Sequence, residues 1–131
     1  MIGRNCYIGP NSVFLPSTAI GDKCSIGSFT ELKYSVIMDD VRIGAGSVVS
    51  NSVSGSHNTL DPHFATEIKK ELVIEIKGLL HQVVQLGTII GDSNITGTRV
   101  LVQAGKMIST GCSVESGVTV TRNIPEKAIV I

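Results

Sequence analysis

Hydrophobic residues recur along this chain at every sixth position. The series begins at Ile2, resumes after one five-residue step at Ile37, and returns in a second run from Ile90. An α-helix would need apolar spacing near 3.6 residues, whereas β-branched residues at a longer fixed period suit short strands around a narrow interior. The pattern predicts a parallel β-helix of stacked six-residue repeats. The series reads Ile2, Ile8, Phe14, Ile20, Ile26, Leu32, Ile37, Ile43, Val49, Ile90, Thr96, Val102, Ile108, Val114 and Val120.

Two further columns of the repeat support this fold. Glycine directly follows the apolar residue at Gly3, Gly9, Gly21, Gly27, Gly44, Gly91 and Gly97, and we expect it to form tight corners. A second inward column is expected four positions after each apolar residue, at Cys6, Ser12, Thr18, Cys24, Thr30, Val36, Val41, Ser47 and Val53.

The cysteines belong to the repeat. If three hexapeptides make one triangular coil, Cys6 and Cys24 stack in adjacent coils about 4.8 Å apart. A disulfide is possible at that separation. Parallel side chains are poorly aimed for one, and the odd cysteine count, completed by Cys112, comes without a secretion signal. Both points favour reduced structural thiols.

The repeat divides a single expected domain, residues 1–131, into two runs of coils. Residues 2–54 and 88–124 should form about five coils, each of which buries its apolar side only by stacking on its neighbours. Residues 55–87 break the period and are expected to form an inserted loop or arm. Within them, Leu72–Gln85 suggests an extended arm or hairpin, and a short helix over Thr66–Leu72 is an alternative.

Composition excludes several partners. The chain has 11 basic and 11 acidic residues, so it offers no net attraction to nucleic acid or to an anionic membrane. No apolar run approaches the roughly 20 residues that span a bilayer, and no leader precedes the first repeat. We therefore expect a cytoplasmic protein.

Three stretches carry a family resemblance. Residues 5–53, which include TELKYSVIMDD and GAGSVVSN, resemble the left-handed β-helix at the C-terminus of sugar-1-phosphate nucleotidylyltransferases and amino-sugar-1-phosphate acetyltransferases. LGTIIGDSNITGT at 86–98 and TVTRNIPEKA at 119–128 extend the match. The resemblance implies a left-handed coil, a homotrimer, and N-acetylation of an amino-sugar phosphate by acetyl-CoA at subunit interfaces.

Few of that family's site residues are retained here. The sugar-phosphate lysine is present as Lys33, but the family's arginine is replaced by Leu15. The catalytic histidine opens an H-x-x-Y motif that should lie between Ile43 and Gly44, which are adjacent in this chain. The asparagine after the GAG motif is retained as Asn51, while SVSGSHN replaces the basic residues expected beyond it. Lys33 and Asn51 are what remains of the acceptor site.

Other candidate residues lie outside this acceptor motif. His57 could replace the missing base, because an imidazole that titrates near neutrality can deprotonate an amine, or it could be an ordinary residue of a flexible loop. The resemblance places contacts to acetyl-CoA near Thr98 and Ser116, which are equally well explained as turn residues. No metal is expected, because the three histidines, His57, His63 and His81, show no zinc-ligand spacing.

The first repeat begins at Ile2, so the top of the coil stack has no cap of its own. An uncovered coil end exposes apolar side chains, and a nucleotidyltransferase domain or subunit is expected there. Two functions remain open at this stage. The chain is either an acetyl-CoA-dependent acyltransferase with a rearranged site or a non-catalytic trimerisation or regulatory domain of a nucleotidylyltransferase.

Overall fold

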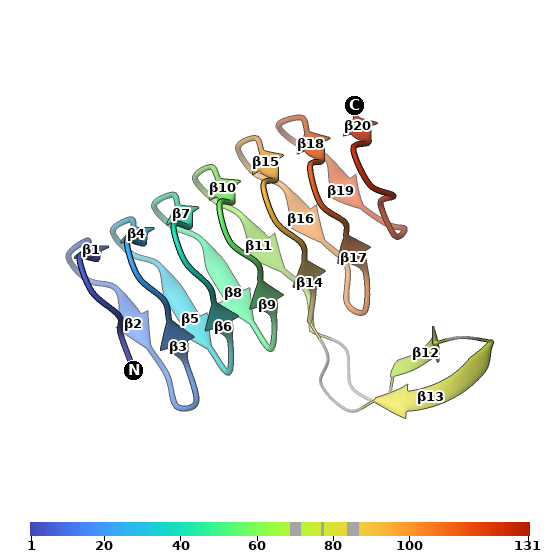
Figure 1. The fold of residues 1–131 in the computed structure, drawn as a ribbon, viewed down its shortest axis with the longest axis horizontal. Helices are drawn as coiled ribbons and strands as arrows, with labels where there is room; N and C mark the ends of the chain where they lie inside the picture. The colour runs from blue at the N-terminus through green and yellow to red at the C-terminus, as the bar shows by residue number, and fades with distance from the viewer. Residues whose placement is uncertain (69–71, 77, 84–86) are drawn as a thin grey trace.

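The computed structural model describes residues 1–68, 72–76, 78–83 and 87–131. The chain forms a left-handed parallel β-helix with about six turns, built from strands of two or three residues (Figure 1). The predicted fold is confirmed, with one turn more than the five expected. No helix in the described segments is long and apolar enough to cross a membrane.

Three parallel sheets form the sides of the prism. Sheet A contains β3 (Ala19–Ile20), β6 (Val36–Ile37), β9 (Val53–Ser54), β14 (Ile89–Ile90) and β17 (Met107–Ile108). Sheet B contains β1 (Tyr7–Ile8), β4 (Ser25–Ile26), β7 (Arg42–Ile43), β10 (Thr59–Leu60), β15 (Ile95–Thr96), β18 (Ser113–Val114) and β20 (Ile129–Val130). Sheet C contains β2 (Val13–Phe14), β5 (Glu31–Lys33), β8 (Val48–Ser50), β11 (Ala65–Thr66), β16 (Leu101–Val102) and β19 (Thr119–Val120). We name the corners between them A–B, B–C and C–A, in chain order.

The sixth-position residues fill the interior as predicted from Ile20 to Val49 and again from Ile90 to Val120. Thr96, the polar exception, is also fully buried. The second inward column was predicted wrongly at two places: Val36 and Val53 are 41% and 36% exposed. Ser35 and Ser52 point inward in their place, because the C–A corner is one residue shorter in those two coils.

The excursion from the β-helix begins later than the expected residue 55. The second five-residue step, from Val49 to Ser54, shifts the register, and Ser54, Leu60 and Thr66 then continue the buried column. β10 and β11 therefore belong to the coils, and the arm lies between β11 and β14. Its described part is the antiparallel hairpin of β12 (Leu72–Ile76) and β13 (Leu79–Val83). The alternative helix falls partly on residues 69–71, outside the described residues.

Glycines of the repeat allow close stacking of turns. A Cβ on Gly27 would lie 2.4 Å from the backbone nitrogen of Ala45, and one on Gly9 would lie 2.5 Å from that of Ser28. We expected these glycines to form the tight corners, but the left-handed backbone conformation of each corner occurs two residues later, mostly at other residue types such as Asn11 and Phe29. The glycine column is therefore required by the contact between coils.

A buried asparagine joins the coils on either side of the arm. The Asn58 side chain is fully buried and donates from Nδ2 to Ser54 Oγ, Gly55 O and Gly91 O at 2.9, 3.0 and 2.7 Å. Its Oδ1 accepts from the backbone N–H of Asn94 at 2.8 Å. Because Gly91 and Asn94 follow the arm in the sequence, these bonds keep the stack continuous across the insertion.

Candidate functional site

The C–A corner brings together the two retained acceptor residues. Lys33 ends β5, Asn51 follows β8 in the next coil, and the backbone N–H of Asn51 donates to the carbonyl of Lys33 at 2.8 Å. The Lys33 ammonium lies 5.9 Å from the centre of the Tyr34 ring, a distance compatible with a cation–π contact. Leu15 occupies the corresponding position of the first coil, where it offers no positive charge to a phosphate.

The A–B corner holds His57, which lies on an ordered turn between β9 and β10. The expectation of a flexible loop there was wrong, because Gly55–Asn58 forms a regular corner of the stack. His57 Nδ1 lies 2.9 Å from Oδ2 of Asp40, which occupies the same position one coil earlier. The two side chains are 63% and 50% exposed. If Nδ1 carries the proton, this contact leaves Nε2 available as a base.

The neighbouring carboxylates of this corner are used within the fold. Asp22 Oδ1 accepts from the backbone N–H of Arg4, and Asp39 Oδ1 accepts from that of Asp22, both at 2.7 Å. Asp92 makes the same contact with the backbone N–H of Ser56 at 2.7 Å. Asp40 differs from them because its partner is the imidazole of His57.

The B–C corner carries the two residues that the resemblance assigned to acetyl-CoA. Thr98 and Ser116 lie in adjacent coils, and the backbone N–H of Thr98 donates to Ser116 Oγ at 2.9 Å. This bond accounts for Ser116 as a turn residue, and the contact with acetyl-CoA stays a prediction. The sequence candidates therefore lie on three different corners of the prism.

The described residues contain no group of three histidine, cysteine or acidic side chains that could hold a metal ion. His57 lies at the A–B corner and His63 at the B–C corner, while the side chain of His81 is outside the described residues. The three cysteines are free. Cys24 Sγ lies 3.0 Å from the carbonyl of Met38, and burial raises the pKa of the Cys24 thiol.

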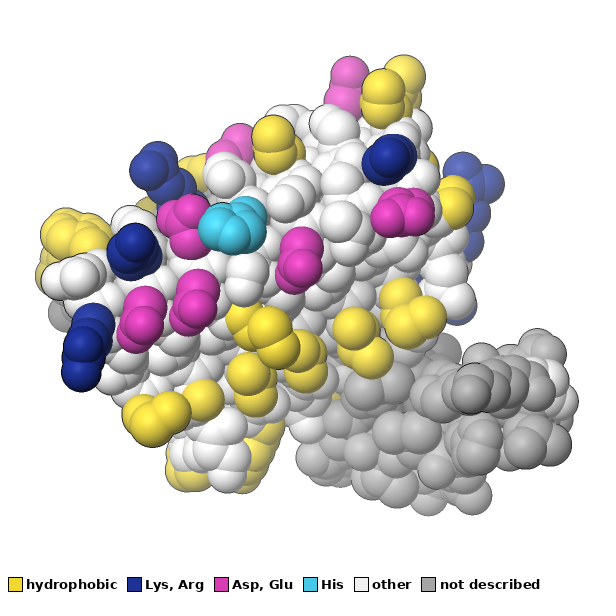
Figure 2. All heavy atoms as spheres, in the orientation of Figure 1, with side chains coloured by type: hydrophobic (Ala, Val, Ile, Leu, Met, Phe, Trp, Pro, Cys, Tyr) yellow, Lys and Arg dark blue, Asp and Glu magenta, His cyan; other side chains and the backbone are white. Residues whose placement is uncertain are grey.

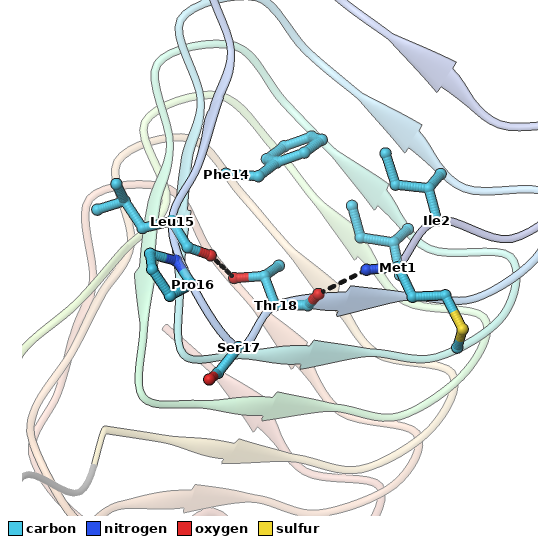
Figure 3. Close-up of a pocket in the computed structure, with 8 residues that line it drawn as sticks. Met1, Ile2, Phe14, Leu15, Pro16, Ser17 and Thr18 are labelled. Atoms are coloured by element: carbon cyan, nitrogen blue, oxygen red, sulfur yellow. Dashed lines mark hydrogen bonds between the residues drawn. The ribbon is translucent and has the colours of Figure 1, made fainter.

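A cavity of about 480 Å³ opens at the N-terminal end of the stack (Figure 3). Its walls are Met1, Ile2, Phe14, Leu15, Pro16, Ser17, Thr18 and Ile20, without an ionisable side chain. Thr18 forms two hydrogen bonds at the rim of the cavity. Its hydroxyl donates to the Leu15 carbonyl at 2.9 Å, and its carbonyl accepts from the Met1 amino group at 3.1 Å. The lining thus offers apolar side chains together with the hydroxyls of Ser17 and Thr18, and no side chain for acid–base chemistry.

The fold and the repeat define the class of the protein as a left-handed β-helix domain of the type found in sugar nucleotidylyltransferases and acetyltransferases. A family model described as the GMPPB C-terminal domain matches residues 1–72. The chain belongs to this family.

Similar sequences include the bifunctional protein GlmU of several microorganisms. The GlmU of Prochlorococcus marinus (strain MIT 9313) is 25% identical over 134 residues, which cover 99% of this chain and 27% of that protein. The GlmU of Methanococcus vannielii is 26% identical over 130 residues, which cover 95% of this chain and 31% of that protein. The chain thus spans about a quarter to a third of the length of these relatives.

Similar solved structures include two N-acyltransferases with low sequence identity. A mutant of AntD from Bacillus cereus, in complex with dTDP-4-amino-4,6-dideoxyglucose and coenzyme A, gives a TM-score of 0.81 at 13% identity, covering 98% of this chain and 76% of that one. A mutant of perosamine N-acetyltransferase from Caulobacter crescentus, in complex with CoA and GDP-perosamine, gives 0.70 at 20% identity, covering 94% and 52%. At these identities the likeness establishes the fold alone.

Proposed function

We propose that this chain is a trimer-forming β-helix domain in sugar-nucleotide synthesis that transfers little or no acetyl group to glucosamine-1-phosphate. The observation that carries the proposal is the missing H-x-x-Y segment between Ile43 and Gly44, which leaves no family base beside the acceptor residues of the same copy. Lys33 and Asn51 share the C–A corner, His57 lies at the A–B corner, and Thr98 lies at the B–C corner. Acyl transfer needs the amine, the thioester and a base within hydrogen-bond reach of one another, and positioning alone is worth about 7–11 kcal/mol.

The acceptor corner also lacks the groups that would bind and activate a sugar phosphate. Of the family's cationic contacts to the sugar phosphate only Lys33 is retained, because Leu15 replaces the family's arginine and SVSGSHN follows Asn51 in place of basic residues. No H-x-x-Y segment separates Ile43 from Gly44, and Gly44 is tied into the stack by its N–H bond to Leu60 O at 2.7 Å. The coils on either side of the missing segment therefore stack directly, without the family's usual base.

Self-association is the positive part of the proposal. Parallel coils leave flat sheet faces, and closed cyclic symmetry covers such faces without open-ended growth. The family resemblance favours three copies. Light scattering at micromolar concentration should return about three times the 13.8 kDa mass of one chain. A monomer mass would remove this part of the proposal.

The open N-terminal end supports a further partner. The cavity of about 480 Å³, lined by apolar side chains together with Ser17 and Thr18, lies where a nucleotidyltransferase domain or subunit is expected. We propose that such a domain covers Ile2, which is 48% exposed, and Ile8, which is 36% exposed, although both belong to the repeat that fills the core elsewhere. Covering these side chains would stabilise the complex by about 25 cal/mol for each Å² of apolar surface removed from water.

A second candidate function is N-acyl transfer through a relocated base, favoured by the 2.9 Å contact between His57 and Asp40. In this scheme the amine attacks the thioester carbonyl of acyl-CoA, His57 Nε2 accepts the amine proton, and the coenzyme A thiolate leaves and is protonated. Asp40 would orient the ring through Nδ1, and Thr98 and Ser116 would contact the coenzyme. His57 would have to act on an amine bound at another copy's C–A corner.

The two functions are separated by thiol release from acetyl-CoA with a panel of amino-sugar phosphates and amino-sugar nucleotides. The assay compares the native chain with His57→Ala and Asn51→Ala. Turnover that is lost in His57→Ala would establish the second function and overturn the first. Turnover that is indifferent to both substitutions would place an active site elsewhere.

A further inference from the structure

We propose that sheet A is the face through which three copies of this chain associate, with their helices parallel and the A–B corner of each copy beside the C–A corner of the next. This inference rests on the proposed trimer and assigns its contact surface. The outward residues of sheet A form one in-register column, which we name the apolar ladder: Ala19, Val36, Val53, Ile89 and Met107.

The apolar ladder is exposed from Val36 to Met107, and Ala19 at its N-terminal end is half-buried. Val36, Val53, Ile89 and Met107 are 41%, 36%, 42% and 43% exposed. Figure 2 shows hydrophobic side chains gathered along this face, across β3, β6, β9, β14 and β17. Because parallel strands lie about 4.8 Å apart, five of them make a continuous apolar strip about 20 Å long. Contiguous apolar surface of this kind marks an interaction site.

The other two faces are less suited to burial. The outward column of sheet B includes Arg42, Ser25 and Thr59, and that of sheet C includes Glu31 and Thr119. Charged side chains are depleted from the centre of protein interfaces because their burial is costly unless they are paired. Sheet A is the face whose outward column carries no polar side chain.

Two hollows on sheet A can receive side chains of a neighbour. One of about 290 Å³ is lined by Ala19, Val36 and Met38 with Asp39 at its border, and one of about 380 Å³ is lined by Ile89 and Met107 with Glu126 at its border. Val53 lies between them on β9, at the middle of the ladder. A face with hollows beside protruding apolar groups can interlock with a second apolar surface.

The charges on the two borders of sheet A identify the occupant as a second copy of the chain. The A–B corner carries five carboxylates, Asp22, Asp39, Asp40, Asp92 and Glu126, against three cations, Arg4, Lys23 and Lys127. The described part of the C–A corner has the opposite balance, with Lys33, Lys106 and Arg122 against Glu67. A parallel ring brings an acidic border next to a basic one at every contact, whereas antiparallel copies would place like charges together.

The level of these charges along the helix agrees with a parallel ring. Arg122 precedes Ile124, which bridges to β17, and Glu126 follows it, so the two side chains flank sheet A in the same coil. Both are exposed. Lys33 and Asp39 flank β6 in the same way. In a ring without a vertical shift, each cation therefore meets the neighbour's carboxylate at its own level.

The test uses three lysine substitutions in one coil, one on each face. Val53→Lys on sheet A should raise the dissociation constant of the trimer at least about 30-fold, measured by sedimentation across a dilution series. Thr59→Lys on sheet B and Ala65→Lys on sheet C are the matched controls. In each of them the dissociation constant of the trimer should stay within about threefold of the native value. Circular dichroism checks that each variant keeps the native fold, and Ile89→Lys repeats the test elsewhere on the ladder.

A native chain that is a monomer would remove the proposed trimer itself and this inference with it. A native trimer that survives both Val53→Lys and Ile89→Lys would overturn only the assignment to sheet A. The parallel arrangement has its own test in a charge exchange. Arg122→Glu and Glu126→Lys should each weaken the trimer about 3- to 10-fold, and the double variant should restore it. If the double variant weakens the trimer by the sum of the two single free-energy effects, the parallel ring is wrong.

Discussion

Removing the Asn58 side chain should destabilise the β-helix far more than its small volume suggests. Asn58→Ala abolishes the bonds from Nδ2 to Ser54 Oγ and to the carbonyls of Gly55 and Gly91, together with the bond from the Asn94 N–H to Oδ1. An amide nitrogen carries two hydrogens, so about three bonds exist at one time. The Asn58 side chain is fully buried, so bulk water does not reach it in the native stack.

The expected loss follows from these partners. Each bond contributes about 1 kcal/mol net, and leaving the buried Asn94 N–H and the part-buried Gly91 carbonyl unpaired adds a desolvation cost of up to about 1–3 kcal/mol per group. Allowing for some relaxation, we expect Asn58→Ala to lower the free energy of unfolding by about 3–5 kcal/mol. A typical domain is stable by only about 5–15 kcal/mol, so the effect is large.

The assay is urea unfolding followed by circular dichroism at one fixed protein concentration, since association also affects stability. Asn123→Ala is the matched control, because Asn123 is exposed and its Oδ1 accepts a single backbone bond, from Met107 at 3.0 Å. It should cost about 1 kcal/mol or less. An Asn58→Ala loss no greater than that of the control would refute the role assigned to this side chain.

Three further outcomes test other parts of the fold. Gly27→Ala should lower the unfolding free energy by about 1–3 kcal/mol in the same assay, because its Cβ would meet the Ala45 nitrogen at 2.4 Å; an unchanged midpoint would contradict the close-stacking argument. Phe64→Ala should cost about 3–5 kcal/mol, since the ring is fully buried, and a loss below 1 kcal/mol would show that β11 is not part of the coil stack. Cys24 should resist alkylation at pH 8 in the native chain and react after unfolding, because burial raises the pKa of its thiol and keeps the thiolate scarce; rapid native modification, read by mass spectrometry, would disagree.

The sequence predicted the fold well where the period is regular. Ile20 and Val102 are buried as the sixth-position rule requires. The prediction failed after the second five-residue step. The inward residues there are Ser54, Leu60 and Thr66, and because two of the three are polar, the hydrophobic period cannot be recognised in the sequence. A narrow interior that accepts hydroxyls bonded to nearby groups cannot be recognised by hydrophobicity alone.

The sequence identified the candidate residues one by one, but it did not predict which of them lie next to each other. The pairing of His57 with Asp40 depends on a coil of 17 residues, and the expected 18-residue period would have aligned His57 with Asp39 instead. The apolar ladder was missed for a similar reason, because Val36 and Val53 were expected to face inward. One residue removed from a corner exchanges inward and outward positions, as a register slip does in any strand.

The most direct test of the central claim is the rate of acetyl transfer to glucosamine-1-phosphate by the trimeric fraction of the native chain. It is measured as thiol release from acetyl-CoA beside a full-length bifunctional GlmU under the same conditions. Because the family's H-x-x-Y segment with its general base is missing between Ile43 and Gly44, we predict a rate at least about 10²–10⁴ lower than that of GlmU. A rate within tenfold of GlmU would contradict the account and show that this β-helix retains a complete acetyltransferase site.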